Sequence, residues 1–93
     1  MDREYIIELR GVDSRGELHE RIAQVLPLPD WYGRNLDALY DMLTEPRFGD
    51  GCVIHFTGCE ELREHMPRYL MAMKQMCSAA EEANSGLTVL FTD

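Results

Sequence analysis

The chain has 93 residues, of which 45% are hydrophobic and 28% are charged, which is typical of a folded globular protein and excludes an intrinsically disordered chain. No apolar run approaches the roughly 20 residues of a membrane-spanning helix, and the length leaves room for a single domain over residues 1–93. The formal net charge of −8 disfavours direct contact with nucleic acid, because an acidic surface repels phosphates, and it favours a basic partner.

The first predicted element is a strand over residues 4–9. Its segment, EYIIEL, is short and rich in β-branched and aromatic residues, and Gly11 ends it. The N-terminal stretch MDREYIIELR is charged from its second residue, which is not the pattern of a secretory signal. We therefore expect a cytoplasmic protein.

A helix is predicted over residues 15–26. Ser14 can cap its N-terminus, with Glu17 three residues further on in capping-box position. Apolar residues recur at helical spacing at Leu18, Ile22, Val25 and Leu26. Pro27 and Pro29 end the helix, because proline lacks the backbone N–H that a helix interior requires.

A loop over residues 27–33 leads to a second predicted helix, over residues 34–44. On a helical wheel its core face carries Leu36, Leu39 and Leu43, with Tyr40 at the margin. Asp37 and Asp41 lie together on the opposite side. Two like charges four residues apart destabilise an isolated helix by about 0.2–0.5 kcal/mol, so stability alone does not explain this pair.

After this helix the chain is interrupted again before a second strand. Pro46, Gly49 and Gly51 break the chain, and CVIHF, residues 52–56, is predicted to be a buried strand. From Glu60 the pattern becomes helical.

Pro67 divides this helical pattern into a short helix and a long one over residues 67–83. The long helix is expected to bury Leu70, Met71, Met73, Met76, Cys77 and Ala80. Gly86 marks a turn, and LTVLF, residues 87–91, is expected to form a strand buried on both faces.

The resulting order of elements is β-α-α-β-α-α-β. Helical crossovers between consecutive strands favour parallel pairing. We therefore predict an α/β fold in which a three-stranded parallel sheet is packed by four helices.

The cysteine pattern indicates structural thiols. The three cysteines, Cys52, Cys59 and Cys77, cannot all pair within one chain, and without a signal sequence an odd count points to reduced thiols. Cys52 and His55 stand three residues apart in a predicted strand, so their side chains face opposite sides. No CxxC or HExxH spacing occurs. We expect buried thiols, no metal site and no cofactor.

The second helix and the loop before it carry the pattern of a protein-binding surface. The aspartate pair has aromatic neighbours of the kind that anchor interfaces, namely Trp31, Tyr32 and Tyr40. Asn35 and Thr44 can add hydrogen bonds at the rim, and Gly33 serves the tight entry into the helix.

Other roles for Asp37 and Asp41 stay open at this point. The two carboxylates can be ordinary solvated side chains, a general acid–base pair or half of a metal site. An enzyme would need a substrate pocket lined by His19, His55 or His65. We expect His19 at an exposed helix position and His65 just before the Pro67 break, so neither is an obvious member of a site.

The stretch LPDWYGRNLDALYDMLTE, residues 28–45, resembles the barstar family, intracellular protein inhibitors of secreted, guanyl-specific ribonucleases of the barnase type. Its specific part is LPDWYGRNLDALYD. The rest of the chain agrees more weakly, through its length, its order of elements and its apolar final strand. The resemblance implies a three-stranded parallel sheet with four helices, which is also what the pattern of elements predicts.

The resemblance also implies inhibition by occlusion of the ribonuclease active site. By position in the motif, Asp41 would take the place of the substrate phosphate, and Asp37 would pair with a basic residue at the rim. Tyr32 would support the helix from within. The complete set of residues expected to bind the partner is Trp31, Gly33, Asn35, Leu36, Asp37, Tyr40, Asp41, Thr44 and Glu45.

The sequence departs from the family pattern at a few positions. Arg34 stands where the best-known member is acidic. At this spacing it can reach Asp37, and such a pair would partly neutralise the negative charge of Asp37 and Asp41. Glu45 replaces a small residue. On the last helix, Ala79 stands where the family has an additional acidic contact, and Glu81 and Glu82 lie about a turn away from that position.

The leading hypothesis is a non-enzymatic inhibitor or immunity protein, a monomer alone that binds a basic ribonuclease one to one. The alternative is a barstar-like binding module whose partner is another toxin nuclease or a regulatory protein. The third hypothesis is an enzyme.

Overall fold

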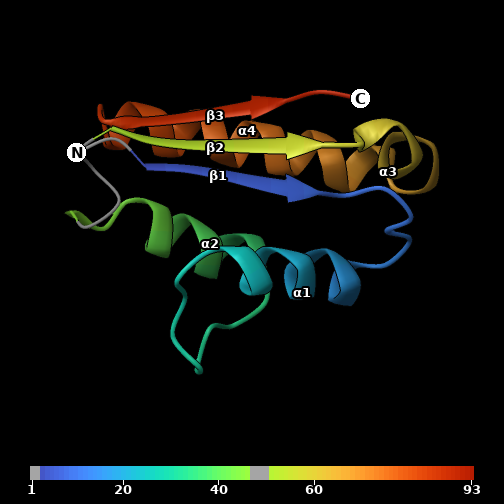
Figure 1. Ribbon diagram of the computed structural model, residues 1–93, viewed down its shortest axis with the longest axis horizontal. Coiled ribbons are helices and arrows are strands. Elements are labelled where there is room, and N and C mark those ends of the chain that lie inside the picture. Colours follow the sequence, from blue (N-terminus) through green and yellow to red (C-terminus); the bar gives the residue numbers. More distant parts are fainter. Residues whose placement is uncertain (1–2, 47–50) are drawn as a thin grey trace.

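The computed structural model describes residues 3–46 and 51–93, so the predicted break at Gly49 lies outside the described residues. In chain order the elements are β1 (Arg3–Glu8), α1 (Arg15–Val25), α2 (Leu36–Leu43), β2 (Cys52–Thr57), α3 (Cys59–His65), α4 (Pro67–Ala83) and β3 (Leu87–Phe91). The strands form one sheet in the order β1-β2-β3, and both pairs are parallel (Figure 1). The described residues thus confirm the predicted sheet of three parallel strands with four helices.

Two helices begin where their sequence signals predict. The Ser14 hydroxyl accepts a hydrogen bond from the backbone N–H of Glu17 at 3.2 Å, which caps α1. The Glu17 carboxylate bonds to Arg21, one turn further along α1, at 3.2 Å. Pro67 is the first residue of α4, where its missing N–H would have had no helical partner in any case.

The helices cover one face of the sheet. When strands are added in sequence order with crossovers of one hand, all the helices fall on the same side. In Figure 1, α4 lies behind the strands, and α1 and α2 lie along the β1 side. The core between sheet and helices includes Ile7, Leu39, Ile54, Phe56, Leu62 and Met73.

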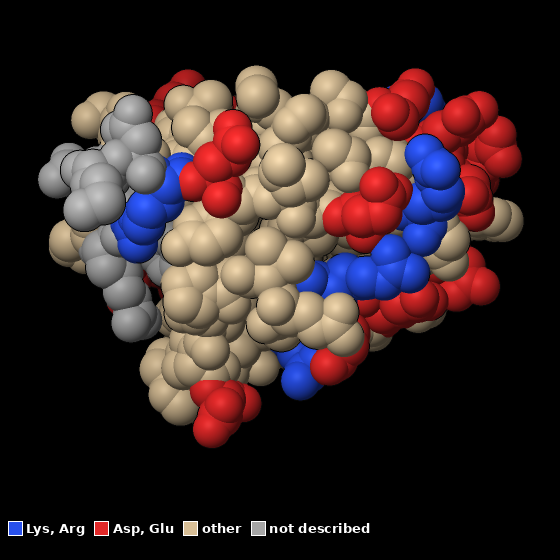
Figure 2. All heavy atoms as spheres, viewed as in Figure 1, with Lys and Arg blue, Asp and Glu red and all other residues tan. Residues whose placement is uncertain are grey.

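The opposite face of the sheet is open, which corrects the prediction that β3 is buried on both faces. Along β3 burial alternates, and Leu90 is 45% exposed. Leu90 stands in register with His55 of β2, which stands in register with Ile6 of β1, itself 56% exposed. Figure 2 shows this face, with uncharged side chains over its middle and charged side chains gathered most densely at the α3 end.

The buried stripe of α4 is narrower than predicted. Leu70, Met73, Cys77 and Ala80 are buried, at spacings of three and four residues. Met71 is 62% exposed, because it lies one residue, about 100° of helix rotation, past Leu70 and points away from the stripe. Met76 is half-buried.

The three cysteines are free and buried, as predicted. Burial raises the pKa of Cys77 to about 12 and also raises the pKa values of Cys52 and Cys59. Among residues 3–46 and 51–93, no helix is both long and apolar enough to cross a bilayer.

Candidate functional site

Helix α2 begins at Leu36, two residues later than predicted, because the backbone of Arg34 is left-handed with φ of 53°. Asn35 is the N-cap. Its Oδ1 accepts a hydrogen bond from the backbone N–H of Ala38 at 2.7 Å, and its Nδ2 donates to the carbonyl of Gly33 at 3.1 Å. The amide predicted to bind at the rim therefore has a structural role that sequence reasoning missed, although an asparagine just before a helical pattern is a recognised capping signal.

The left-handed turn also redirects the Arg34 side chain. We expected it to reach Asp37 from one turn back in the same helix. Instead its guanidinium forms an ion pair with Glu20 of α1. Because Arg34 lies outside α2, its positive charge is held beside Glu20 of α1. The prediction that Arg34 pairs with Asp37 and partly neutralises its negative charge is therefore wrong.

Asp37 and Asp41 are both exposed, on the face of α2 opposite the buried Leu39 and Leu43. Within the described part of the chain, neither carboxylate has an ion-pair or hydrogen-bond partner. Asp37 lies in the first turn, where the helix dipole favours a negative charge, whereas Asp41 lies further along and lacks this support. Among the described residues, two carboxylates one turn apart therefore stand without a compensating partner.

The loop before α2 exposes one aromatic ring and buries the next. Trp31 is 73% exposed and Tyr32 only 6%. A hydrogen bond of 3.0 Å from the backbone N–H of Tyr32 to the carbonyl of Pro29 closes the turn that separates them. A Cβ added at Gly33 would lie 3.2 Å from the Cβ of Ala38, so the absence of a side chain lets the loop pass close to α2.

Tyr32 is held by His19, and this corrects the expectation that His19 is exposed. His19 is completely buried. Its Nδ1 lies 2.7 Å from the hydroxyl of Tyr32, and its Nε2 lies 2.7 Å from the hydroxyl of Tyr69 on α4. Burial, and secondarily the charge of Arg34, lowers the pKa of His19, and burial raises the pKa of Tyr32. The sequence carries no local signal for these contacts, because the partners are 13 and 50 residues away.

The C-terminal end of α2 is fixed by hydrogen bonds. The Thr44 hydroxyl donates to the carbonyl of Tyr40 at 2.9 Å, and Asn84, which follows α4, donates from Nδ2 to the carbonyl of Leu43 at 2.9 Å. Leu36 and Tyr40 are half-buried against the core, and Thr44 and Glu45 are half-buried where the helix ends. The bond from Asn84 thus ties the C-terminal end of α2 to the segment that follows α4.

The two glutamates of the last helix differ. The Glu81 carboxylate accepts a hydrogen bond from the backbone N–H of Val89 at 3.0 Å, so it is engaged with the edge strand β3. Glu82 is exposed.

The histidines do not join the aspartates. His19 is bonded to the two tyrosines in the core, and His55 lies on the open sheet face, where its Nε2 is 2.9 Å from the hydroxyl of Thr92. His65 is exposed at the end of α3. Among the described residues, no three side chains of His, Cys, Asp or Glu are grouped closely enough to hold a metal ion.

Comparison with known proteins identifies the same family as the motif. The family described as Barstar (barnase inhibitor) matches residues 3–92, which contain every described element. A protein of Bacillus subtilis (strain 168) named "Putative ribonuclease inhibitor YrdF" is 48% identical over 42 residues, which make up 45% of this chain and 46% of that protein. The aligned region thus spans less than half the length of that relative.

Proposed function

Because the chain belongs to the barstar family, we propose that it inhibits a basic, guanyl-specific ribonuclease of the barnase type by covering the active site of that enzyme. The inhibitory surface would be α2 together with the loop that precedes it. The observation that carries this proposal is the pair of exposed carboxylates, Asp37 and Asp41, which have no partner within the described part of the chain.

The charges suit a site that binds RNA phosphate. Asp41 would stand in for the phosphate and accept hydrogen bonds from the cationic groups of the ribonuclease, and Asp37 would pair with a basic group at the rim. Because neither carboxylate has a partner among residues 3–46 and 51–93, binding would form new ion pairs without breaking one within these residues.

The surrounding residues would supply shape and rigidity. The exposed Trp31 offers a large ring as an anchor, and the half-buried Leu36, Tyr40, Thr44 and Glu45 would form the border of the contact. Gly33 and Asn35 would act by fixing the entry into α2, which lowers the entropy lost on binding.

The proposal includes the state of the protein in the cell. The free inhibitor would be a cytoplasmic monomer, would need no metal or cofactor, would catalyse no reaction, and would form a one-to-one complex with its target.

The test is titration of the purified protein into barnase while RNA cleavage is followed. We expect cleavage to stop at one equivalent of inhibitor. Removing one partner of a desolvated charge pair costs about 2–5 kcal/mol, a range to which complexes of this family themselves contributed. Asp41→Ala should therefore raise the Kd by about 30- to 5,000-fold.

Asp13→Ala is the matched control, because Asp13 is exposed, lies outside the proposed surface and has no partner in the described residues. It should inhibit like the unmodified protein. Failure of the unmodified protein to inhibit barnase-type enzymes would refute the ribonuclease assignment, and tight binding of another basic protein would then support the alternative partner. Equal inhibition by Asp41→Ala would refute the role of Asp41.

A further inference from the structure

Three rings from three parts of the chain meet beneath the proposed surface. His19 comes from α1, Tyr32 from the loop before α2, and Tyr69 from α4. The imidazole centroid lies 5.8 Å from the ring centroid of Tyr32 and 6.1 Å from that of Tyr69. One completely buried side chain therefore joins the loop to two helices.

The hydrogen bonds have a definite direction. A neutral imidazole offers one donor and one acceptor. The hydroxyl of Tyr32 is buried, and within the described residues His19 is its only partner, so it must donate to Nδ1 to avoid an unsatisfied buried proton. Nε2 then carries the proton of His19 and donates it to the hydroxyl oxygen of Tyr69.

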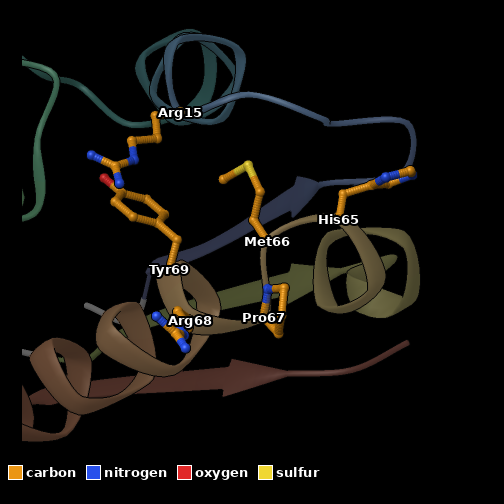
Figure 3. Close-up of a pocket in the computed structure, with 6 residues that line it drawn as sticks. All are labelled: Arg15, His65, Met66, Pro67, Arg68 and Tyr69. Carbon is orange, nitrogen blue, oxygen red and sulfur yellow. The ribbon is translucent and has the colours of Figure 1, made fainter.

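Tyr69 is the less buried of the two tyrosines that His19 joins. It is half-buried and lines a pocket of about 310 Å³ with Arg15 and Met66. Figure 3 shows the Arg15 guanidinium beside the Tyr69 ring, and its carbon lies 4.9 Å from the ring centroid. A hydroxyl oxygen has two lone pairs, so that of Tyr69 can accept the bond from His19 whatever the direction of its own proton.

We propose that His19 and Tyr69 are positioning residues of the inhibitory surface, because they fix Tyr32 and through it the backbone that carries Trp31 and Gly33. This inference rests on the proposed function for its effect on the partner. Gly33 passes close to Ala38, and the N–H of Tyr32 closes the turn at Pro29. A shift of the Tyr32 side chain would therefore also move the backbone on both sides of it. Ordering the loop in the free protein removes an entropic cost from binding.

The test compares Tyr69→Phe with Tyr5→Phe. Each change removes a single hydroxyl from a half-buried tyrosine, but the Tyr5 hydroxyl has no hydrogen bond within the described residues. In Tyr69→Phe, the Nε2–H of His19 loses its acceptor. We expect about tenfold faster amide hydrogen exchange in residues 28–35 of the free protein and about tenfold faster dissociation from barnase. Tyr5→Phe should change neither quantity.

Tyr32→Phe breaks the same chain at its other end and should produce the same two effects. In the double variant Tyr32→Phe/Tyr69→Phe, the increases in exchange rate and in dissociation rate should be smaller than the products of the two single increases. The two changes are not independent, because both break the same chain of hydrogen bonds. A general loss of stability would instead accelerate exchange throughout the protein and lower the melting temperature in parallel.

Exchange in residues 28–35 that is the same in Tyr69→Phe and Tyr5→Phe would overturn the inference. This arm uses the free protein, so it decides the matter even where the unmodified protein fails to bind barnase and the proposed function falls. Faster exchange with unchanged dissociation from a barnase that does bind would also overturn it.

Discussion

Arg34 is the residue whose backbone decides where the proposed surface begins. A left-handed conformation costs an L-residue with a side chain roughly 1–2 kcal/mol. Here the turn places Asn35 where its side chain caps α2, and it sends the guanidinium of Arg34 to Glu20. This one backbone conformation thus ends the loop before α2, begins the helix and keeps the guanidinium of Arg34 away from Asp37.

His19 makes the stability of the protein depend on pH. Its pKa in the folded state lies below the ordinary value of 6.5, so between these two values the unfolded chain binds more protons than the folded one. Protonation of His19 should therefore leave the free energy of unfolding unchanged above about pH 6.5 and should decrease it as the pH falls below that value. Within the described residues, the imidazole is hydrogen-bonded to the hydroxyls of Tyr32 and Tyr69, and the charge of Arg34 acts on it.

Urea unfolding at several pH values between 5 and 8 measures this dependence. His19→Gln keeps a polar side chain but cannot titrate, so its free energy of unfolding should vary less over the same range. An identical pH profile in the two proteins would assign the dependence to other groups.

At the scale of the element, α2 is short and relies on its caps. Asn35→Ala removes the acceptor for the Ala38 N–H, and loss of such a cap costs about 0.5–2 kcal/mol. We expect a decrease of that size in the free energy of unfolding, measured with urea. Asn35→Asp keeps the acceptor and should retain most of the stability. Equal stability of Asn35→Ala and the unmodified protein would show that the cap contributes nothing.

Elements with a signal inside their own sequence could be predicted. Ser14 and Pro67 mark helix starts through their own hydrogen-bonding chemistry, and both helices begin there. The exposure of Asp37 and Asp41 followed from the helical period, whereas the role that the motif implies for them stays a prediction.

What could not be predicted depends on contacts between distant segments or on backbone conformation. Nothing in the residue type of Arg34 specifies a left-handed turn. The burial of His19 depends on tyrosines in two other segments, and the exposure of Leu90 depends on which face of the sheet the helices cover. Each of these is decided by the packing of the whole chain rather than by its local pattern.

At the scale of the whole molecule, the net charge of −8 should control the rate of association with a basic ribonuclease. Salt screens this attraction over about 10 Å at 0.1 M ionic strength. The association rate constant with barnase should fall about tenfold or more between low and high salt, whereas dissociation should change much less. Stopped-flow measurements over a series of sodium chloride concentrations test this.

Asp41→Ala should reduce the salt dependence of association only in part, because most of the acidic field comes from the rest of the chain. An association rate that is independent of salt would contradict electrostatic steering by this protein.

The three buried thiols give the molecule a set of internal reporters. Cys52 begins β2, Cys59 begins α3 and Cys77 lies within α4, so each belongs to a different element. With their pKa values raised by burial, few of these groups are thiolates at neutral pH, and a labelling reagent can reach them only when the surrounding element opens. The order in which the thiols become labelled would therefore record, without any engineered probe, the order in which the elements of the protein come apart.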